Sequence, residues 1–395
     1  LGGWRQRCKI VYSAHCPCLR VDTQINRAPM QLLKNVDLFD PAPRGVVDVL
    51  VGGGAVLAAS PGLEVQGTRG LVEVHDLQGA RVIPGLVDAH VHVTGGGGEA
   101  GFSSRVPPRM VSELALAGVT TVVGLLGTDG RTRTMRELIA RTYGLREEGL
   151  SAWCWTGSYE MPVRTLTGSV RDDIVFIEPV LGVGELAISD HRSSQPTLEE
   201  LLRVASDVHV AGLMTNKAGV LHLHLGDGPR GLELVQQSCE RTELPARVFH
   251  PTHLNRNREL LASAVSMMGD ESNFAGMRFD LTAFPEGDIG DGLSAADALA
   301  EIHAARGSCD GVTVSSDGGG CMPKFDAQGR IVAYGVGQSS TLLETVATSV
   351  NGHGLALAQV LPCVTSTVAQ LLELRSKGRV VPGADADLVV LGEGC

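Results

Sequence analysis

Two histidines separated by one residue form the clearest metal-binding pattern in this sequence. His90 and His92 lie in Asp88-Ala-His-Val-His, at the end of an apolar run that follows Pro84-Gly85. Because side chains alternate along a β-strand, both imidazoles would point to the same side and could converge on one metal ion. The spacing therefore predicts that His90 and His92 are metal ligands at the C-terminal end of a strand.

A second pair of histidines lies in the apolar run 220–225. His222 and His224 would share one face of that strand, so spacing alone does not decide which of them is a ligand. We favour His224 because it is nearer the C-terminal end of the run. His222 stays open as a core residue or as a partner that orients a ligand.

Two more candidates follow later apolar runs. His253 comes directly after the run 248–252, and Asp317 comes directly after the run 312–316. His250, inside the first of these runs, is interpreted as a polar residue near the strand end. We expect His253 and Asp317 to be metal ligands.

The number of candidate ligands favours two metal ions over one. Four histidines and Asp317 are more than one tetrahedral zinc ion needs, so a bridging ligand should join two ions. Glu185 is the candidate for a second carboxylate that spans the pair, because it would begin an otherwise apolar fourth strand at 186–189. Its alternative interpretation is a charge at the edge of a loop.

The elements that must position these side chains alternate between apolar runs and helical patterns. After a strand that ends at Val93, seven further runs are typical of β-strands: 119–126, 151–156, 186–189, 220–225, 248–252, 279–282 and 312–316. Charged and apolar residues recur at three-to-four-residue spacing between them, in 132–148, 197–209, 231–243, 257–268 and 294–305. The alternation predicts an α/β fold, a (β/α)₈ TIM barrel with its functional groups at the strand C-termini.

The flanks of the barrel predict a small β-sandwich-like domain built from both chain ends. Residues 29–83 supply its N-terminal part, 84–378 form the barrel, and 379–395 return to the small domain and stop short of its last strands. Residues 1–28 form a basic extension that we interpret as disordered, removed, or a weak transit segment.

Composition limits the function classes. With 33 basic and 44 acidic side chains the formal net charge is −11, which argues against a nucleic-acid partner. No run approaches the roughly 18 apolar residues of a membrane-spanning helix, so we expect no membrane association. Nine cysteines without a C-x-x-C pair favour free thiols in a reducing compartment, hence the cytoplasm.

The motifs together resemble the isoaspartyl dipeptidases of the amidohydrolase superfamily, over a region from about Pro29 to about Leu391. The matching segments are 84–101, 118–129, 157–167, 188–193, 224–227, 251–257 and 315–318. The resemblance implies hydrolysis of β-aspartyl dipeptides by a zinc-bridging hydroxide. It also implies two zinc ions per subunit and a cytoplasmic homo-oligomer, an octamer in the family.

Residue by residue, the resemblance implies roles in metal and substrate binding. His90, His92 and Asp317 would hold one zinc ion, while His224 and His253 would hold the other. Asp317 would also move the proton. The substrate-binding roles fall on Glu99 for the α-ammonium, Tyr159 for the scissile carbonyl, Arg192 and Arg256 for carboxylates, and Gly97 and Thr128 for further contacts.

The chain departs from the family pattern near the bridge and the substrate. Glu185 stands where the family has a bridging carboxylated lysine, beside an apparent extra residue at Gly184, and Cys321 replaces a serine near the substrate. Two alternatives remain. One is another amidohydrolase chemistry on the same metals, a cyclic-amide or acyl-amino-acid hydrolase, and the other is a non-catalytic barrel scaffold.

Overall fold

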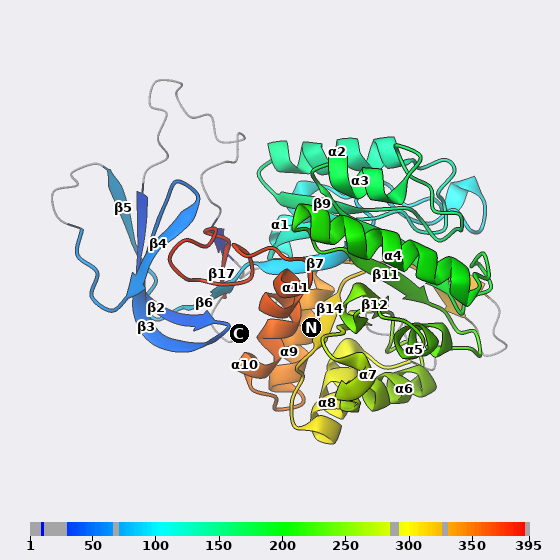
Figure 1. The fold of residues 1–395 in the computed structure, drawn as a ribbon. Helices are drawn as coiled ribbons and strands as arrows, with labels where there is room; N and C mark the ends of the chain where they lie inside the picture. Colours follow the sequence, from blue (N-terminus) through cyan, green and yellow to red (C-terminus); the bar gives the residue numbers. More distant parts are fainter. Residues whose placement is uncertain (1–8, 12–29, 66–70, 285–291, 326–330, 392–395) are drawn as a thin grey trace.

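The computed structural model describes residues 9–11, 30–65, 71–284, 292–325 and 331–391. Figure 1 shows a barrel of strands and helices with a smaller sheet beside it. The expectation for residues 1–28 lies outside the described residues, except for the short strand β1 (Lys9–Val11). None of the helices described is long and apolar enough to cross a membrane.

Eight parallel strands form the barrel and confirm the predicted fold. They are β7 (Leu86–Val91), β8 (Val119–Gly124), β9 (Ser151–Thr156), β10 (Val180–Ile188), β11 (Val220–Leu225), β12 (Phe249–Thr252), β13 (Phe279–Thr282) and β14 (Val312–Ser315). Strands β7 to β12 pair in chain order, and β13 pairs with β14. Backbone hydrogen bonds close the two gaps, from Leu254 N–H to Asp280 O at 3.2 Å and from His92 N–H to Gly318 O at 2.8 Å.

The barrel strands are buried along almost their whole length, with only Ser151 and Trp153 of β9 partly exposed, as expected for parallel strands covered by helices. The fourth strand differs from its predicted limits, because β10 begins at Val180 and not at 186. Glu185 therefore lies inside the strand, and the prediction that it starts the strand was wrong. Gly182, Gly184 and the glutamate interrupt the apolar run, which hid the first half of the strand.

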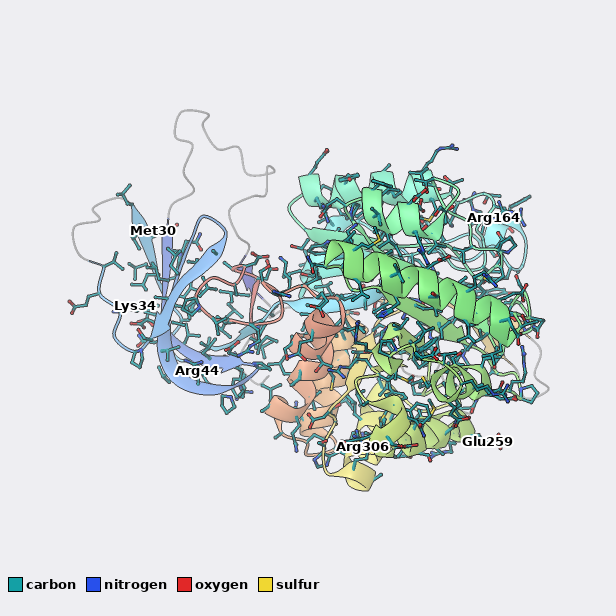
Figure 2. The ribbon with its side chains drawn as sticks, viewed as in Figure 1. Met30, Lys34, Arg44, Arg164, Glu259 and Arg306 are labelled. Atoms are coloured by element: carbon teal, nitrogen blue, oxygen red, sulfur yellow. The ribbon has the colours of Figure 1, made fainter. Side chains whose placement is uncertain are left out.

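Helices cover the outside of the barrel (Figure 1). They are α1 (Val111–Leu116), α2 (Met135–Glu147), α3 (Val170–Phe176), α4 (Leu198–Thr215), α5 (Glu233–Glu240), α6 (Arg258–Gly269), α7 (Glu271–Phe274), α8 (Ala295–Arg306), α9 (Thr341–Asn351), α10 (Leu357–Val360) and α11 (Ser366–Leu371). Thr134, Thr197 and Asn257 cap α2, α4 and α6, each accepting a hydrogen bond from a first-turn amide. Figure 2 shows charged side chains such as Glu259 and Arg306 on the periphery.

The smaller sheet joins strands from both ends of the chain. It contains β2 (Met30–Asp40), β3 (Ala42–Gly52), β4 (Ala55–Ser60), β5 (Val72–Asp76), β6 (Arg81–Pro84), β17 (Leu388–Val390) and β1. Strand β17 lies between β1 and β6, and a separate hydrophobic cluster that includes Leu33, Val49 and Leu388 packs here. Only Gly85 separates β6 from β7, so this sheet anchors the start of the strand that carries His90.

Candidate metal centre and active site

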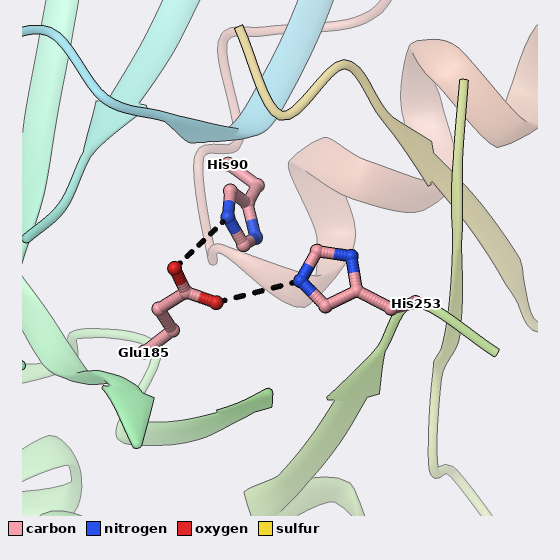
Figure 3. A group of neighbouring side chains, drawn as sticks. All are labelled: His90, Glu185 and His253. Atoms are coloured by element: carbon pink, nitrogen blue, oxygen red, sulfur yellow. Dashed lines mark ion pairs between the residues drawn. The ribbon is translucent and has the colours of Figure 1, made fainter. Parts of the chain in front are cut away.

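Six side chains that the sequence singled out as metal ligands meet at the C-terminal end of the barrel. Each is at most 9% exposed: His90, His92, Glu185, His224, His253 and Asp317. Potential ligand atoms lie within 4.8 Å of one another in two groups, His90–Glu185–His253 and His90–His92–Asp317. Figure 3 shows the Glu185 carboxylate between the imidazoles of His90 and His253.

The two oxygens of Glu185 face different histidines. Oε1 lies 3.5 Å from Nε2 of both His90 and His92. Oε2 lies 3.0 Å from Nδ1 of His224 and 3.5 Å from Nε2 of His253. One carboxylate is thus placed between two pairs of imidazoles.

A bulge in β10 brings Glu185 to this position. Val183 pairs with Leu221 and Leu186 pairs with Leu223, so Gly184 and Glu185 together stand opposite His222. Such bulges re-aim a side chain next to a functional site. A side chain at 184 would not fit, because its Cβ would lie 2.8 Å from Cβ of His222.

The cluster fits a metal ion of the zinc type. Nε2 of His90 and Oδ1 of Asp317 are buried and lack a hydrogen-bond partner among the described residues, although they are 3.5 Å apart. Imidazole nitrogens with carboxylate oxygens are the donors that zinc prefers. His253 and Asp317 also have positive φ angles, of 65° and 49°. Such strained backbone conformations are concentrated at functional sites.

The electrostatics of the cluster favour ionised carboxylates. Burial raises the pKa of Asp317, but its contacts with His90 and His92 outweigh burial and hold that pKa below its usual range. Burial and the imidazoles oppose one another in the same way at Glu185, whose pKa falls well below normal. Burial lowers the pKa of His253 to about 3, so this imidazole is neutral and can donate its lone pair to a metal.

A cavity of about 350 Å³ opens beside the cluster. Its walls include His92, His224 and Asp317 from the cluster. They also include every side chain or backbone position predicted to bind substrate: Gly97, Glu99, Thr128, Tyr159, Arg192, Arg256 and Cys321. The structure therefore brings all the predicted site residues together in one place.

Comparison with known proteins identifies the family. Residues 81–393 match the amidohydrolase family. The chain belongs to this family. Beyond the family, the resemblance to β-aspartyl dipeptidases is confirmed by solved structures.

The similar structures include a β-aspartyl dipeptidase from Fervidobacterium islandicum AW-1 in complex with the β-Asp-Leu dipeptide. It is 40% identical, with a TM-score of 0.86, and the match covers 93% of both chains. A second structure of that enzyme has a TM-score of 0.82 at 40% identity and covers 92% of this chain and 93% of that one. Imidazolonepropionase of Ruegeria pomeroyi is 31% identical over 133 residues, which are 32% of this chain and 33% of that enzyme.

The charged groups of this amidohydrolase's cavity differ in how strongly they are paired. Arg192 donates to both carboxylate oxygens of Asp190, at 3.0 and 2.7 Å, and lies 3.6 Å from Oε1 of Glu99. Arg256 has a weaker partner, Asp227 at 3.5 Å, whose side chain is 68% exposed. Arg256 therefore keeps more of its charge available for a ligand.

Tyr159 reaches from the wall of the cavity to the metal cluster. Its hydroxyl lies 2.8 Å from Nδ1 of His224. Burial, and then the charge of Glu185, raise the pKa of Tyr159 well above its ordinary value. The hydroxyl therefore stays protonated and can donate a hydrogen bond.

Other residues of the site were missed or misread from sequence. Asp190 lies 2.9 Å from Nε2 of His224, and its only sequence signal was its place in segment 188–193, which resembles the family. His250 was expected to be a polar strand-end residue, but it is fully buried inside the barrel and contacts His222 at 2.8 Å. The prediction was wrong because His250 is the second residue of β12, and its contacts with His222 and Thr313 place its side chain inside the barrel.

Proposed function

We propose that this amidohydrolase cleaves the β-aspartyl peptide bond of dipeptides and uses two zinc ions. The observation that supports this most directly is the cavity, in which Arg192, Arg256 and Glu99 lie beside a cluster of buried residues of the types that bind metal ions. A β-aspartyl dipeptide offers the matching groups, since it has two carboxylates and one ammonium. The similar enzyme from Fervidobacterium islandicum was solved with such a dipeptide.

The proposal assigns the cluster residues to two ions. His90, His92 and Asp317 would hold one, His224 and His253 the other, and Glu185 would contact both. The observation in support is that each oxygen of Glu185 faces one pair of imidazoles. When bound, two such ions lower the pKa of a shared water to near neutrality and supply a hydroxide that can attack an amide carbon.

Two side chains of the chain would perform the remaining chemistry. The Tyr159 hydroxyl would donate a hydrogen bond to the carbonyl oxygen as negative charge develops there, a contribution of about 3 kcal/mol in comparable sites. Asp317 has a buried oxygen without a hydrogen-bond partner among the described residues. It would accept the proton of the nucleophile and deliver it to the departing amine.

The other cavity residues would hold the substrate. The planar guanidinium groups of Arg192 and Arg256 match carboxylates in geometry. Glu99, which accepts a hydrogen bond from the Thr128 hydroxyl at 3.0 Å, would receive the α-ammonium. Gly97 and Thr128 would add backbone and hydroxyl contacts, and Cys321 would lie beside the bound substrate.

The same proposal includes a cytoplasmic homo-oligomer that acts on small molecules. The cysteine content favours a reducing compartment, and all the described cysteines are free thiols. A cyclic-amide or acyl-amino-acid hydrolase fits less well, because its substrates have fewer charges than Glu99, Arg192 and Arg256 together would bind. A non-catalytic scaffold would have no need for the six converging ligands.

One assay tests the activity directly. The purified chain is reconstituted with zinc and incubated with β-Asp-Leu or α-Asp-Leu at matched concentrations. We expect cleavage of β-Asp-Leu alone and two zinc ions per subunit by metal analysis. Preference for α-Asp-Leu would overturn the substrate assignment, and a chain that binds no metal would support the scaffold.

A further inference from the structure

A line of hydrogen-bonded side chains crosses the interior of the barrel behind His90. Nδ1 of His90 lies 2.8 Å from Nε2 of His222, whose Nδ1 lies 2.8 Å from Nδ1 of His250. Nε2 of His250 lies 2.9 Å from Oγ1 of Thr313, which donates to Oδ1 of Asp280 at 2.6 Å. All five side chains are fully buried, so water does not compete for these bonds.

The direction of every hydrogen bond in this line follows from its first member. Nε2 of His90 faces Glu185 and Asp317, so a metal bound there requires its lone pair and leaves the proton on Nδ1. That N–H must then donate to His222. A neutral imidazole has one donor and one acceptor, so His222 in turn donates to His250.

The far end of the line is a fixed acceptor. His250 donates through Nε2 to Thr313, and the Thr313 hydroxyl donates to Asp280. Hydroxyls of Thr252 and Ser315 donate to the other oxygen of Asp280, each at 2.6 Å. The Asp280 carboxylate therefore accepts three hydrogen bonds from hydroxyl groups, and the line of hydrogen bonds ends there.

We propose that His222 and His250 are positioning residues. They connect the Nδ1–H of His90 to the Asp280 carboxylate through a line of hydrogen bonds, and this strengthens the bond of His90 to a metal ion. A metal-binding histidine commonly donates its second N–H to a carboxylate or carbonyl, which fixes its tautomer and raises its basicity. Here three side chains extend that contact across the barrel. This inference rests on the proposed metal site.

The decisive variant acts far from the metal. Thr313→Val keeps the shape of the side chain but removes the hydroxyl that links His250 to Asp280. The matched control is Thr121→Val on β8, since Thr121 is also fully buried and its hydroxyl lacks a hydrogen-bond partner among the described residues. Both variants place a valine on a barrel strand, where it is a favourable residue.

The readout is zinc affinity of the full chain in the absence of substrate, measured by competition with a chromophoric chelator. We expect Thr313→Val to weaken the binding of at least one zinc ion by about 10-fold, in the range known for partners of metal ligands, and Thr121→Val to match the wild type. Equal zinc affinities for all three proteins would overturn the proposal that this line of hydrogen bonds strengthens metal binding by His90. A wild type that binds no zinc would overturn the proposed function as well.

A second pair of variants separates hydrogen bonding from packing. His222→Gln retains an oxygen that can accept from His90 and an N–H that can donate to His250, whereas His222→Leu retains neither. We expect zinc affinity to fall in the order wild type, His222→Gln, His222→Leu. An affinity of the leucine variant that equals or exceeds that of the glutamine variant would show that His222 only packs.

Discussion

Oε2 of Glu185 lies 3.0 Å from Nδ1 of His224, while Oε1 of the same carboxylate lies 3.5 Å from Nε2 of His90. A glutamate thus occupies the place where the family resemblance predicts a carboxylated lysine. Its side chain is shorter than a lysine carbamate, and the bulge in β10 shows how the backbone brings it close enough. A lysine must react with carbon dioxide to become a carbamate, whereas the carboxylate of Glu185 is already present in the side chain.

The first prediction concerns this bridge. Zinc reconstitution of the metal-free protein should proceed equally with and without bicarbonate, because Glu185 supplies the O–C–O group itself. Glu185→Gln should lose affinity for at least one of the two zinc ions, since an amide is a weaker ligand than a carboxylate. Metal stoichiometry after reconstitution measures both effects, and bicarbonate-dependent uptake would argue against the bridge.

The bulge itself can be tested at Gly184. Gly184→Ala would bring a Cβ to 2.8 Å from Cβ of His222, so we expect a loss of about 1–3 kcal/mol in the free energy of unfolding. Gly144→Ala in α2 is the control, because its Cβ would meet only an arginine side chain at 3.8 Å. The control should be neutral or stabilising by up to about 1 kcal/mol. Urea unfolding compares the two, and equal stabilities would contradict the packing argument.

The third prediction concerns Asp317. Asp317→Asn removes the group that we propose accepts and returns the proton, so kcat on β-Asp-Leu should fall by about 10² or more. Because an amide oxygen can still act as a ligand, metal should be retained at least in part. Steady-state kinetics together with metal analysis separates these effects. Near-normal turnover would rule out the proposed role.

The two arginines give a fourth prediction with different outcomes at each site. Arg192→Met and Arg256→Met should each lower kcat/KM by an amount on the order of 2 to 4 kcal/mol, and by less on substrates whose carboxylate is amidated. Arg192→Met should also reduce stability, because its partner Asp190 is 3% exposed at the side chain and would be left without its cation. Asp227, the partner of Arg256, is exposed and needs no such compensation.

Kinetics on paired free and amidated dipeptides, with thermal unfolding alongside, distinguish recognition from structure. Arg256→Met should keep the wild-type unfolding temperature. A loss of kcat/KM that is the same for both substrates would mean that the arginines only stabilise the cavity.

Much of the fold and of the site could be predicted because it depends on the spacing of residues that are close together in the sequence. The alternation of apolar runs with helical patterns predicted the barrel. The period-two spacing of His90 and His92, and the position of Asp317 directly after an apolar run, predicted the place where its ligands meet. The early half of β10 was missed because glycines break its apolar pattern. The contact between His222 and His250 joins residues 28 positions apart on neighbouring strands. It depends on strand register, which sequence spacing within one strand does not contain.

The last prediction uses the pH dependence of stability at His250. Burial lowers the pKa of this histidine from 6.5 to about 4, with Asp280 opposing part of the effect. The neutral form is therefore the one that the folded state accommodates. Its contribution to stability is fully present above pH 6.5 and is lost as the pH falls through 4. The difference of about 2.5 pH units corresponds to roughly 3 kcal/mol.

His250→Gln cannot titrate, so the free energy of unfolding of this variant should fall less between pH 7 and pH 4 than that of the wild type. Urea unfolding of the metal-free proteins at several pH values measures the two slopes, and the absence of metal removes any contribution from zinc release. If His250→Gln and wild type lose stability in parallel, the pKa of His250 is the same in the folded and unfolded states. The folded protein would then not favour the neutral form of this imidazole, and the proposed role of His250 as a buried acceptor for His222 would lose its support.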